Sequence, residues 1–367
     1  MSKVTKNSKQ KTLEEQYLEL KQMVPAALRE KFEAMESGEL LPEITGDLPF
    51  KHVYDPEVHP DRPAKLLKLL FHEDFFVTGS VREEASVASI YSKKSILDIL
   101  ARLSTQGVAN IEMQAVAQDF IVQRSEIYAS DLIIMQYSAR KNQPKLQISY
   151  TNLPTNYVVV LMKESPKLFK GNKDFIHYKT EQTNTGIVLP TMVKIVYIEL
   201  EKCLKLVKSG TYPENEKELC QLLAFMADVN DEYAVNIARE NPEYGAIRDE
   251  LRDMSKSKEE LIAMLRDKYE EIIRNSELEQ AKEDGRLEGW SEGRSEGRSE
   301  GRSEGEYLII INQARKKLTK NISAEDCAEM LEKDVILIEK IYSLIADDPT
   351  SDDESIFKQL QSGTMTN

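Results

Sequence analysis

The chain has 367 residues and a mass of 42.0 kDa, a length that suits two domains of ordinary size, and its 41% hydrophobic residues exclude a wholly disordered protein. Its net charge of −14 is uneven, because residues 1–165 carry −2 and the remainder carries −12. Proteins that coat DNA present a basic surface, so this balance excludes a general DNA-coating protein but not a site that handles DNA through metal ions.

The first 44 residues are predicted to form a helical segment ahead of the main domain. Apolar residues recur at helical spacing over residues 13–36, and Pro25 divides this stretch into two short amphipathic helices. A loop with glycine and proline follows. A further helix is predicted to start near Arg62 and Pro63, because proline is favoured in the first turn of a helix.

Residues 45–214 are predicted to form an α/β domain. Between about residue 85 and residue 165 the pattern changes to short strand-like runs, and a long helix over about 115–140 separates the second run from the third. The predicted strands are residues 95–103, 108–114, 146–151, 157–162 and 192–200.

The C-terminal part of the chain is predicted to be helical: an extension over residues 215–284, a repeat over 285–306, a small helical region over 307–346 with Ser323 as a helix cap, and a disordered tail over 347–367. In the repeat, glycine recurs every four residues, and each glycine in a helix interior costs about 1 kcal/mol relative to alanine. Arginine and glutamate are spaced by two or six residues and miss the i,i+3 and i,i+4 positions that stabilise a helix. The repeat is therefore predicted to be a solvated linker. The alternative is a helix whose arginine stripe meets a glutamate stripe on a partner.

Cysteine and histidine content disfavours two further classes of site. The cysteines are odd in number and far apart, which argues against a disulfide scaffold, and the four histidines show no zinc-binding spacing.

No stretch approaches the roughly 18–20 apolar residues of a membrane span, and the N-terminus lacks the apolar segment of a secretory signal. The sequence predicts a protein of the reducing cytoplasm with no membrane partner.

The residues that suggest chemistry lie in SILDILARLSTQGVANIEMQ, residues 95–114. Asp98 interrupts an apolar strand, and a buried carboxylate is costly unless a metal ion, a cation or hydrogen bonds compensate it. The strand period of two puts Glu112 and Gln114 on one face of the next strand. A hairpin centred on residue 105 places Asp98 opposite Glu112. These oxygen ligands suit Mg²⁺, with Mn²⁺ or Ca²⁺ as alternatives, and they predict an ion that contacts a phosphate of the substrate. The structural alternative is a carboxylate pair at a strand edge with solvent or salt-bridge partners.

This run, continued by RSEIY at residues 124–128 and by Gln136, resembles the PD-(D/E)XK nuclease family transposases, also called the Rpn recombination-promoting nucleases. DLPFKHVY at residues 47–54 resembles the family's D-x-x-F-K motif, and IVYIELEK at residues 195–202 is similar to its strand ending in EL-x-K. The glycine repeat and the short C-terminal helices are also typical, so the resemblance covers most of residues 45–346. The sequence departs from the family pattern at Ser104-Thr105, where acids are common, and over residues 80–93.

The resemblance implies an α/β fold with a restriction-endonuclease-like PD-(D/E)XK core, a central mixed sheet flanked by helices, and a C-terminal helical extension. In such a core Asp98 is the bridging metal ligand, Glu112 is the second, and the backbone carbonyl of Met113 is a further ligand. Gln114 stands where most of the superfamily has a lysine that orients the attacking water. Glutamine can orient a water by hydrogen bonding but brings no positive charge to the transition state.

Two helical residues are expected beside this site. Arg124 and Tyr128 are four residues apart and share one helix face, and the resemblance places them near the metal ligands, with Arg124 on a phosphate or on Glu112. The alternative is a packed tyrosine and a surface arginine. Gln136 is a further supporting candidate, although it lies about 80° around the helix from Tyr128 and need not share that face.

Lys51 is a candidate contact to a DNA phosphate, and its structural alternative is a salt bridge with Asp47 or a loop anchor. The acid that the superfamily carries on its first helix is left open, because Asp47, Glu83 and Glu84 compete for it.

Taken together, the residues and the resemblance predict a metal-dependent DNA endonuclease linked to DNA recombination or transposition. The alternative function is a catalytically decayed nuclease fold that acts as a self-associating or partner-binding module. DNA is the expected partner, and self-association through the C-terminal helical region is a further expectation.

Overall fold

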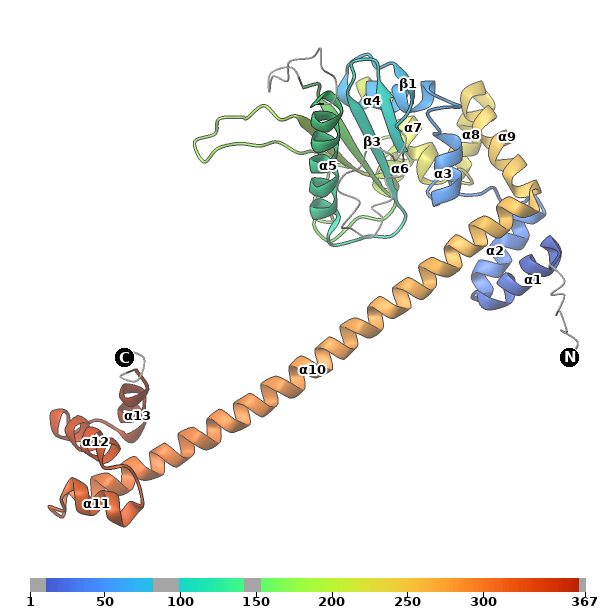
Figure 1. The fold of residues 1–367 in the computed structure, drawn as a ribbon. Coiled ribbons are helices and arrows are strands. Elements are labelled where there is room, and N and C mark those ends of the chain that lie inside the picture. The colour runs from blue at the N-terminus through green and yellow to red at the C-terminus, as the bar shows by residue number, and fades with distance from the viewer. Residues whose placement is uncertain (1–10, 82–98, 142–152, 363–367) are drawn as a thin grey trace, which may run out of the picture. The chain divides into compact units, whose positions relative to one another are not determined.

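The computed structural model describes residues 11–81, 99–141 and 153–362, and it divides into two compact units, residues 1–272 and 273–367, whose boundary lies within one long helix (Figure 1). Asp98, Glu83, Glu84 and the strand predicted at 146–151 lie outside the described residues. The candidate chemistry belongs to the first unit.

The first unit is built on a six-stranded mixed sheet with the order β1-β2-β3-β4-β6-β5. Strands β3, β4 and β6 run parallel, whereas the β1–β2, β2–β3 and β5–β6 pairs are antiparallel. Every residue of β3 and β4 is buried, as expected of parallel strands covered on both faces. The strands are β1 (Val77–Ser80), β2 (Ile99–Leu103), β3 (Val108–Gln114), β4 (Asn156–Met162), β5 (Ile176–Tyr178) and β6 (Val193–Glu199).

The turn between β2 and β3 has the predicted register. Ile99 pairs with Ile111, and every other described pair of this hairpin is likewise centred on residue 105. The left-handed residue of the turn is Gln106, with φ of 67°, rather than the glycine that follows it. Gly107 is needed for a different reason, because a Cβ there would lie 2.4 Å from the backbone oxygen of Thr155, just before β4.

Helices cover both faces of the sheet (Figure 1). One face, which includes Val158, Val160 and Tyr197, packs against α5. The opposite face packs against α3, α4, α6 and α7, and α8 and α9 extend this helical layer. The helices are α3 (Asp47–Val53), α4 (Asp61–Phe71), α5 (Ile121–Lys141), α6 (Leu200–Ser209), α7 (Lys217–Ala227), α8 (Glu232–Glu240) and α9 (Pro242–Lys256).

The two N-terminal helices form as predicted. α1 (Leu13–Met23) begins with a capping box at Thr12, and Pro25 directly precedes α2 (Ala26–Glu36). Their apolar faces, with Tyr17 and Phe32 buried, pack against the first turns of α10 (Lys258–Leu318). This packing makes the N-terminal helices part of the first unit.

The glycine repeat is helical, which corrects the prediction of a linker and agrees with the alternative of a helix. It lies inside α10, a continuous helix of 61 residues, and every residue from 272 to 304 is exposed. The predicted charge spacing fails at both ends of the repeat: Arg302 pairs with Glu306 at i,i+4 across 3.4 Å, and Arg286 pairs at i,i+3 across 2.6 Å with Glu283, which lies just before the repeat. Both ends of α10 pack in apolar clusters, and a helix held at both ends propagates through a segment that could not start one alone.

The second unit has its own core. The last turns of α10 pack with α11 (Ala324–Leu331), α12 (Val335–Asp347) and α13 (Asp353–Ser362) around Ile311, Ile341 and Phe357. Ser323 caps α11 as predicted, accepting a hydrogen bond from the backbone of Asp326. The predicted disordered tail is wrong for residues 353–362, because α13 buries three apolar side chains in this core.

Two short strands of the sheet were not predicted, and one helix is shorter than predicted. β1 and β5 have four and three residues and form the two edges of the sheet, where a short run leaves little periodicity to detect. The helix predicted from about residue 115 begins at Ile121.

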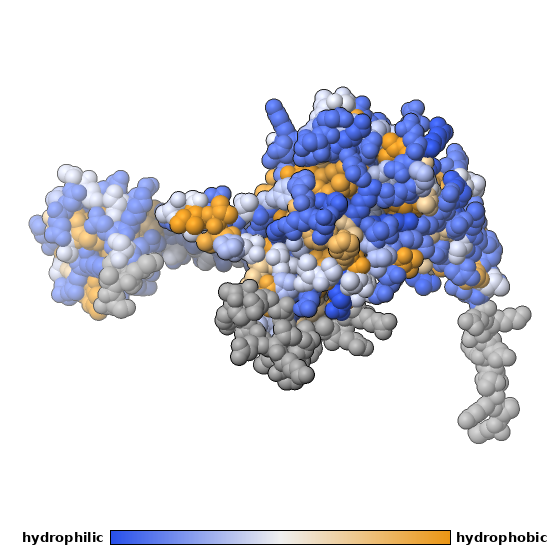
Figure 2. All heavy atoms as spheres, turned by 90° about the horizontal axis from the view of Figure 1, so that it is seen from above, coloured by the Kyte–Doolittle hydropathy of each residue, from blue (hydrophilic) through white to orange (hydrophobic). Residues whose placement is uncertain are grey.

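Within the described ranges, none of the helices is both long and apolar enough to cross a membrane. The face shown in Figure 2 is mostly hydrophilic, with apolar side chains in small separate patches.

Candidate active site

The side chains of Asn110, Glu112 and Gln114 lie on the sheet face that α5 covers. Alternate residues of β3, among them Ile111 and Met113, point to the opposite face and join its apolar core. The three polar side chains are almost fully buried, with exposed fractions of 0%, 1% and 8%. A buried row of polar groups is costly unless each group has a partner, so this row is the first place to look for a function.

One carboxylate oxygen, Oε1 of Glu112, gathers three donors. Gln114 donates to it through Nε2 at 2.8 Å, Arg124 Nη2 lies 2.5 Å away, and the hydroxyl of Tyr128 is at 3.5 Å. Arg124 also donates through Nε to the hydroxyl of Tyr128. The guanidinium is a charged donor, and charged hydrogen bonds are about twice as strong as neutral ones.

Helix α5 holds Arg124 and Tyr128 against the sheet. They are one helical turn apart, as predicted, and Tyr128 is 3% exposed. Between them Ser125 forms a hydrogen bond of 2.6 Å with the hydroxyl of Tyr197 on β6, and the apolar Ile121 and Leu132 pack on the same sheet face. Of the two predicted partners of Arg124, this structure shows Glu112, and the phosphate contact stays a prediction.

Asp98 lies outside the described residues, so the predicted carboxylate pair is tested only through its neighbours. The pair nearest to it in β2 is Ile99 with Ile111, and this pair has the predicted register. The side chain of Met113 packs in the apolar core on the sheet face opposite to α5. Its predicted metal ligand is the backbone carbonyl, which does not depend on where the side chain lies.

Two of the predicted supporting residues are not brought to Glu112. Gln136 donates to the backbone oxygen of Gln106 in the β2–β3 turn at 3.0 Å, and it lies twelve residues, about 18 Å, along α5 from Arg124. Gln136 therefore contacts the β2–β3 turn rather than Glu112, and its phosphate contact stays a prediction. Lys51 pairs with Asp47 at 2.7 Å within α3, which is its predicted structural alternative.

The donor set fits a hard divalent cation. Glu112 offers a carboxylate, Gln114 an amide oxygen and Met113 a backbone carbonyl, and Mg²⁺ and related ions prefer such oxygens. Among residues 11–81, 99–141 and 153–362 there is no group of three or more histidine, cysteine, aspartate or glutamate residues that could hold a metal. In this structure the guanidinium of Arg124 provides a positive charge beside Glu112.

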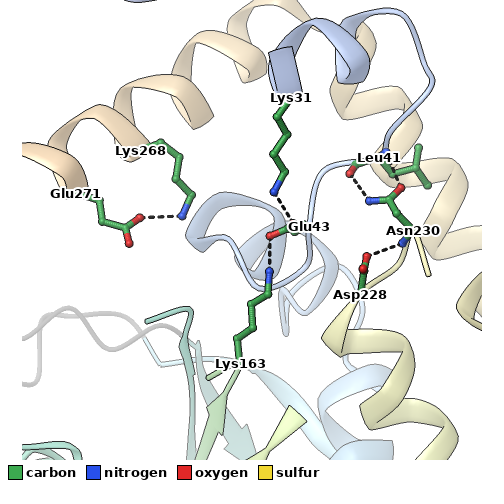
Figure 3. Close-up of polar contacts among 8 residues, drawn as sticks. All are labelled: Lys31, Leu41, Glu43, Lys163, Asp228, Asn230, Lys268 and Glu271. Atoms are coloured by element: carbon green, nitrogen blue, oxygen red, sulfur yellow. Dashed lines mark hydrogen bonds and ion pairs between the residues drawn. The ribbon is translucent and has the colours of Figure 1, made fainter. Parts of the chain in front are cut away.

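A second polar cluster, which the sequence did not indicate, joins the N-terminal helices to the end of β4 (Figure 3). Glu43 lies between Lys31 of α2 and Lys163, and its Oε2 accepts from Lys163 Nζ at 2.8 Å. Burial favours the protonated form of Glu43, but the two ammonium groups outweigh burial and lower its pKa to about 2. Lys163 directly follows β4, and its backbone N–H donates to the carbonyl of Gln114 at 2.8 Å.

A third cluster lies at the end of β6. The carboxylate of Glu199 is fully buried, and its Oε1 accepts from His177 Nε2 at 2.9 Å and from Lys202 Nζ at 2.5 Å. Burial raises the pKa of Glu199, but hydrogen bonds from Lys202, Ser165 and His177 outweigh burial and hold it below the ordinary value. The signal in the sequence was a carboxylate within the apolar run IVYIEL, the same signal that singled out Asp98.

Comparison with known proteins agrees with this geometry. Residues 81–281 match the family model described as PD-(D/E)XK nuclease family transposase, which is more than half of the chain, so the chain belongs to that family. Neither the curated proteins nor the solved structures give a significant match. The matched range includes β2, β3 and α5 but neither the D-x-x-F-K segment nor the glycine repeat. The mixed sheet flanked by helices is consistent with the fold of this family.

Proposed function

We propose that this member of the PD-(D/E)XK nuclease family transposases is a divalent-metal-dependent DNA endonuclease linked to DNA recombination or transposition. The observation that carries the proposal is the buried Glu112, whose Oε1 is contacted by Gln114 and Arg124 at the end of a parallel strand. Nucleases of this family generally use divalent metals. We place the enzyme in the cytoplasm, since its three cysteines are free and buried.

In this proposal Asp98, Glu112 and the backbone carbonyl of Met113 hold Mg²⁺, with Mn²⁺ or Ca²⁺ as alternatives. The ion, when bound, would supply a Lewis acid for the phosphate and lower the pKa of a water molecule. The register of the β2–β3 hairpin supports the choice of Asp98, because each described pair is centred on the residue midway between Asp98 and Glu112.

The protein's own groups would position the reactants. Gln114 is uncharged and is held beside Glu112, so its part is to orient a water by hydrogen bonding rather than to neutralise charge. Arg124 contacts Tyr128 through Nε, Glu112 through Nη2 and Gln118 through Nη1, and its side chain is 28% exposed. A phosphate would have to exchange with the long 3.4 Å contact to Gln118. A guanidinium donor beside the scissile phosphate suits the charge that develops during phosphodiester hydrolysis.

The test is a plasmid cleavage assay with Mg²⁺, Mn²⁺ or Ca²⁺. We expect the wild-type protein to convert supercoiled plasmid to nicked or linear DNA, and Asp98→Asn and Glu112→Gln to lose this activity. Glu126→Gln is the matched control, because Glu126 is on α5 but is exposed and pairs with Lys179. A wild-type protein inert in all three metals would refute the proposal, and activity retained in both site variants would refute the assignment of Asp98 and Glu112.

The alternative function is a catalytically decayed nuclease that acts as an interaction module. Under both functions we expect self-association through the second unit and the repeat. The repeat presents Arg294, Arg298 and Arg302 on an exposed helix together with glutamates at the same period of four. We expect the full-length chain to sediment as a dimer and reversal of these three arginines to glutamate to give a monomer. A wild-type chain that sediments as a monomer would refute self-association without affecting the nuclease proposal.

A further inference from the structure

The loop between β4 and β5 is locally basic in an acidic protein. Residues 163–173, here called the lysine loop, contain four lysines and one acid, whereas the whole chain has a net charge of −14. The lysines are spaced through the loop rather than gathered on a helix face, and they are Lys163, Lys167, Lys170 and Lys173.

The lysine loop starts beside Gln114. The backbone N–H of Lys163 donates to the Gln114 carbonyl at 2.8 Å, and Gln114 pairs with Met162 in the parallel ladder. Further along, Lys167 Nζ lies 3.5 Å from Asp119 Oδ2, in the segment that leads from β3 to α5. The loop therefore lies at the same end of the sheet as Glu112 and Gln114.

Two side chains, Phe169 and Lys202, hold the loop in place. Phe169 stacks on His177, with ring centroids 4.8 Å apart, and lies 5.4 Å from the ring of Tyr197 on the face that α5 covers. Lys202 Nζ donates to the backbone oxygens of Asn172 and Asp174 at 3.0 and 3.1 Å while it contacts the buried Glu199. The Glu199 cluster thus has a use, because it fixes a lysine that anchors the loop.

Three lysines of the anchored loop project into solvent. Lys170 and Lys173 are exposed, and neither forms a salt bridge with a carboxylate of the described part of the chain, whereas Lys167 does. Lys167 is 83% exposed, and its aspartate partner is 69% exposed, so that pair adds little stability. Several exposed lysines elsewhere in the first unit, Lys68 among them, have close carboxylate partners, whereas Lys205 on α6 is exposed and has no salt bridge among the described residues. The three charges are therefore available to a ligand.

We propose that Lys167, Lys170 and Lys173 bind the phosphate backbone of duplex DNA beside the cleavage site. The inference rests on the proposed nuclease function and adds the surface that holds the substrate. Lysine is a point charge suited to phosphate rather than to a base edge, so the contact fixes the position of the duplex and carries no sequence preference.

The test is the salt dependence of DNA binding, measured by fluorescence anisotropy of a labelled duplex with the full-length chain in EDTA, where no cleavage occurs. Each neutralised phosphate contributes about 0.9 to the slope of log K against log salt. Replacing the three lysines by alanine should lower the slope by about 2.7 and weaken binding about 500-fold at 0.1 M salt, taking the electrostatic contribution to vanish near 1 M. Replacing them by arginine should preserve the slope.

The matched control removes the same charge elsewhere. Lys68, Lys217 and Lys256 are exposed lysines on α4, α7 and α9, and their replacement by alanine should leave the slope within about 0.9 of the wild-type value. If the wild-type chain binds DNA and cleaves plasmid but the loop variant matches the control, the loop inference fails and the nuclease function stands. If the wild-type chain neither binds nor cleaves DNA, the nuclease function fails, and the loop inference fails with it.

Discussion

Arg124 offers a test of the metal site that does not depend on cleavage. Glu112 is 1% exposed and Arg124 Nη2 lies 2.5 Å from its Oε1, so Arg124→Met leaves a buried carboxylate without this charge. Breaking a buried pair by removing one partner costs about 3–5 kcal/mol. Because the Arg124 side chain is 28% exposed, water can partly replace it, and we expect a loss of about 3 kcal/mol in EDTA.

A divalent ion should restore much of this loss. A ligand at 100 times its dissociation constant stabilises the folded state by about 2.7 kcal/mol, and in the variant no guanidinium competes for Glu112. Stabilisation by 10 mM Mn²⁺ should therefore be larger in Arg124→Met than in the wild-type protein. In a Glu112→Gln background the arginine substitution should cost little and Mn²⁺ should have little effect.

Because the chain has two units, unfolding must be followed locally. Hydrogen exchange measured by mass spectrometry on peptides from β3 and α5 gives the free energy of opening at this site. Arg252→Met is the control, since Arg252 and its partner Asp249 have side chains 43% and 73% exposed and the change should stay within about 0.5 kcal/mol. An equal deficit in EDTA and in Mn²⁺ would refute the assignment of Glu112 as a metal ligand.

Three further predictions concern stability, each read by hydrogen exchange of the sheet. The pKa of Glu43 is about 2 in the folded chain against 4.5 for the free group, so its ionised form stabilises the fold by at most about 3 kcal/mol, a contribution that is complete above pH 4.5 and is lost as the pH falls towards 2. Glu43→Gln should therefore cost about 3 kcal/mol at pH 7 but only about 2 kcal/mol at pH 3.5. A loss of stability that does not change with pH over this range would contradict the assignment. Gly107→Ala should destabilise the β2–β3 hairpin by about 1–3 kcal/mol through a clash with the Thr155 backbone, and an unchanged hairpin would show that the backbone can yield. The side-chain amide of Asn110 is fully buried and has no hydrogen-bond partner in the described part of the chain. Asn110→Leu should therefore stabilise the folded protein by about 1–2 kcal/mol. A destabilised variant would show that the amide does have a hydrogen-bond partner.

The centre of the candidate site was predictable because its geometry is local. Alternation along β3 puts Glu112 and Gln114 on one face, a tight turn fixes the hairpin register, and a spacing of four places Arg124 and Tyr128 together. Glu43 and Lys163 are 120 residues apart in sequence, and nothing in either local pattern indicates their contact. Such pairings depend on how the helices pack, and packing is not encoded in the periodicity of a single segment.

The glycine repeat shows where local rules mislead in the opposite direction. Six glycines and mismatched charges argue against an isolated helix, and these penalties are real. Leu261 and Leu265 at one end of α10 and Ile311 at the other are buried in separate cores, so both ends of the helix are fixed by tertiary packing. The repeat has only to propagate a helix that its flanks have nucleated, which costs far less than starting one.

The same distinction between local and global properties applies to charge. The net charge of −14 describes the whole chain, whereas a phosphate responds mainly to charges within a Debye length, about 10 Å at 0.1 M salt. At the end of the sheet near Gln114, Arg124 contacts Glu112 and the lysine loop begins beside Gln114, so both supply positive charge there. The distant acids weaken the attraction without cancelling it. The expected result is weak, steeply salt-dependent and sequence-tolerant DNA binding, in which the carboxylates repel the phosphate until a cation neutralises them.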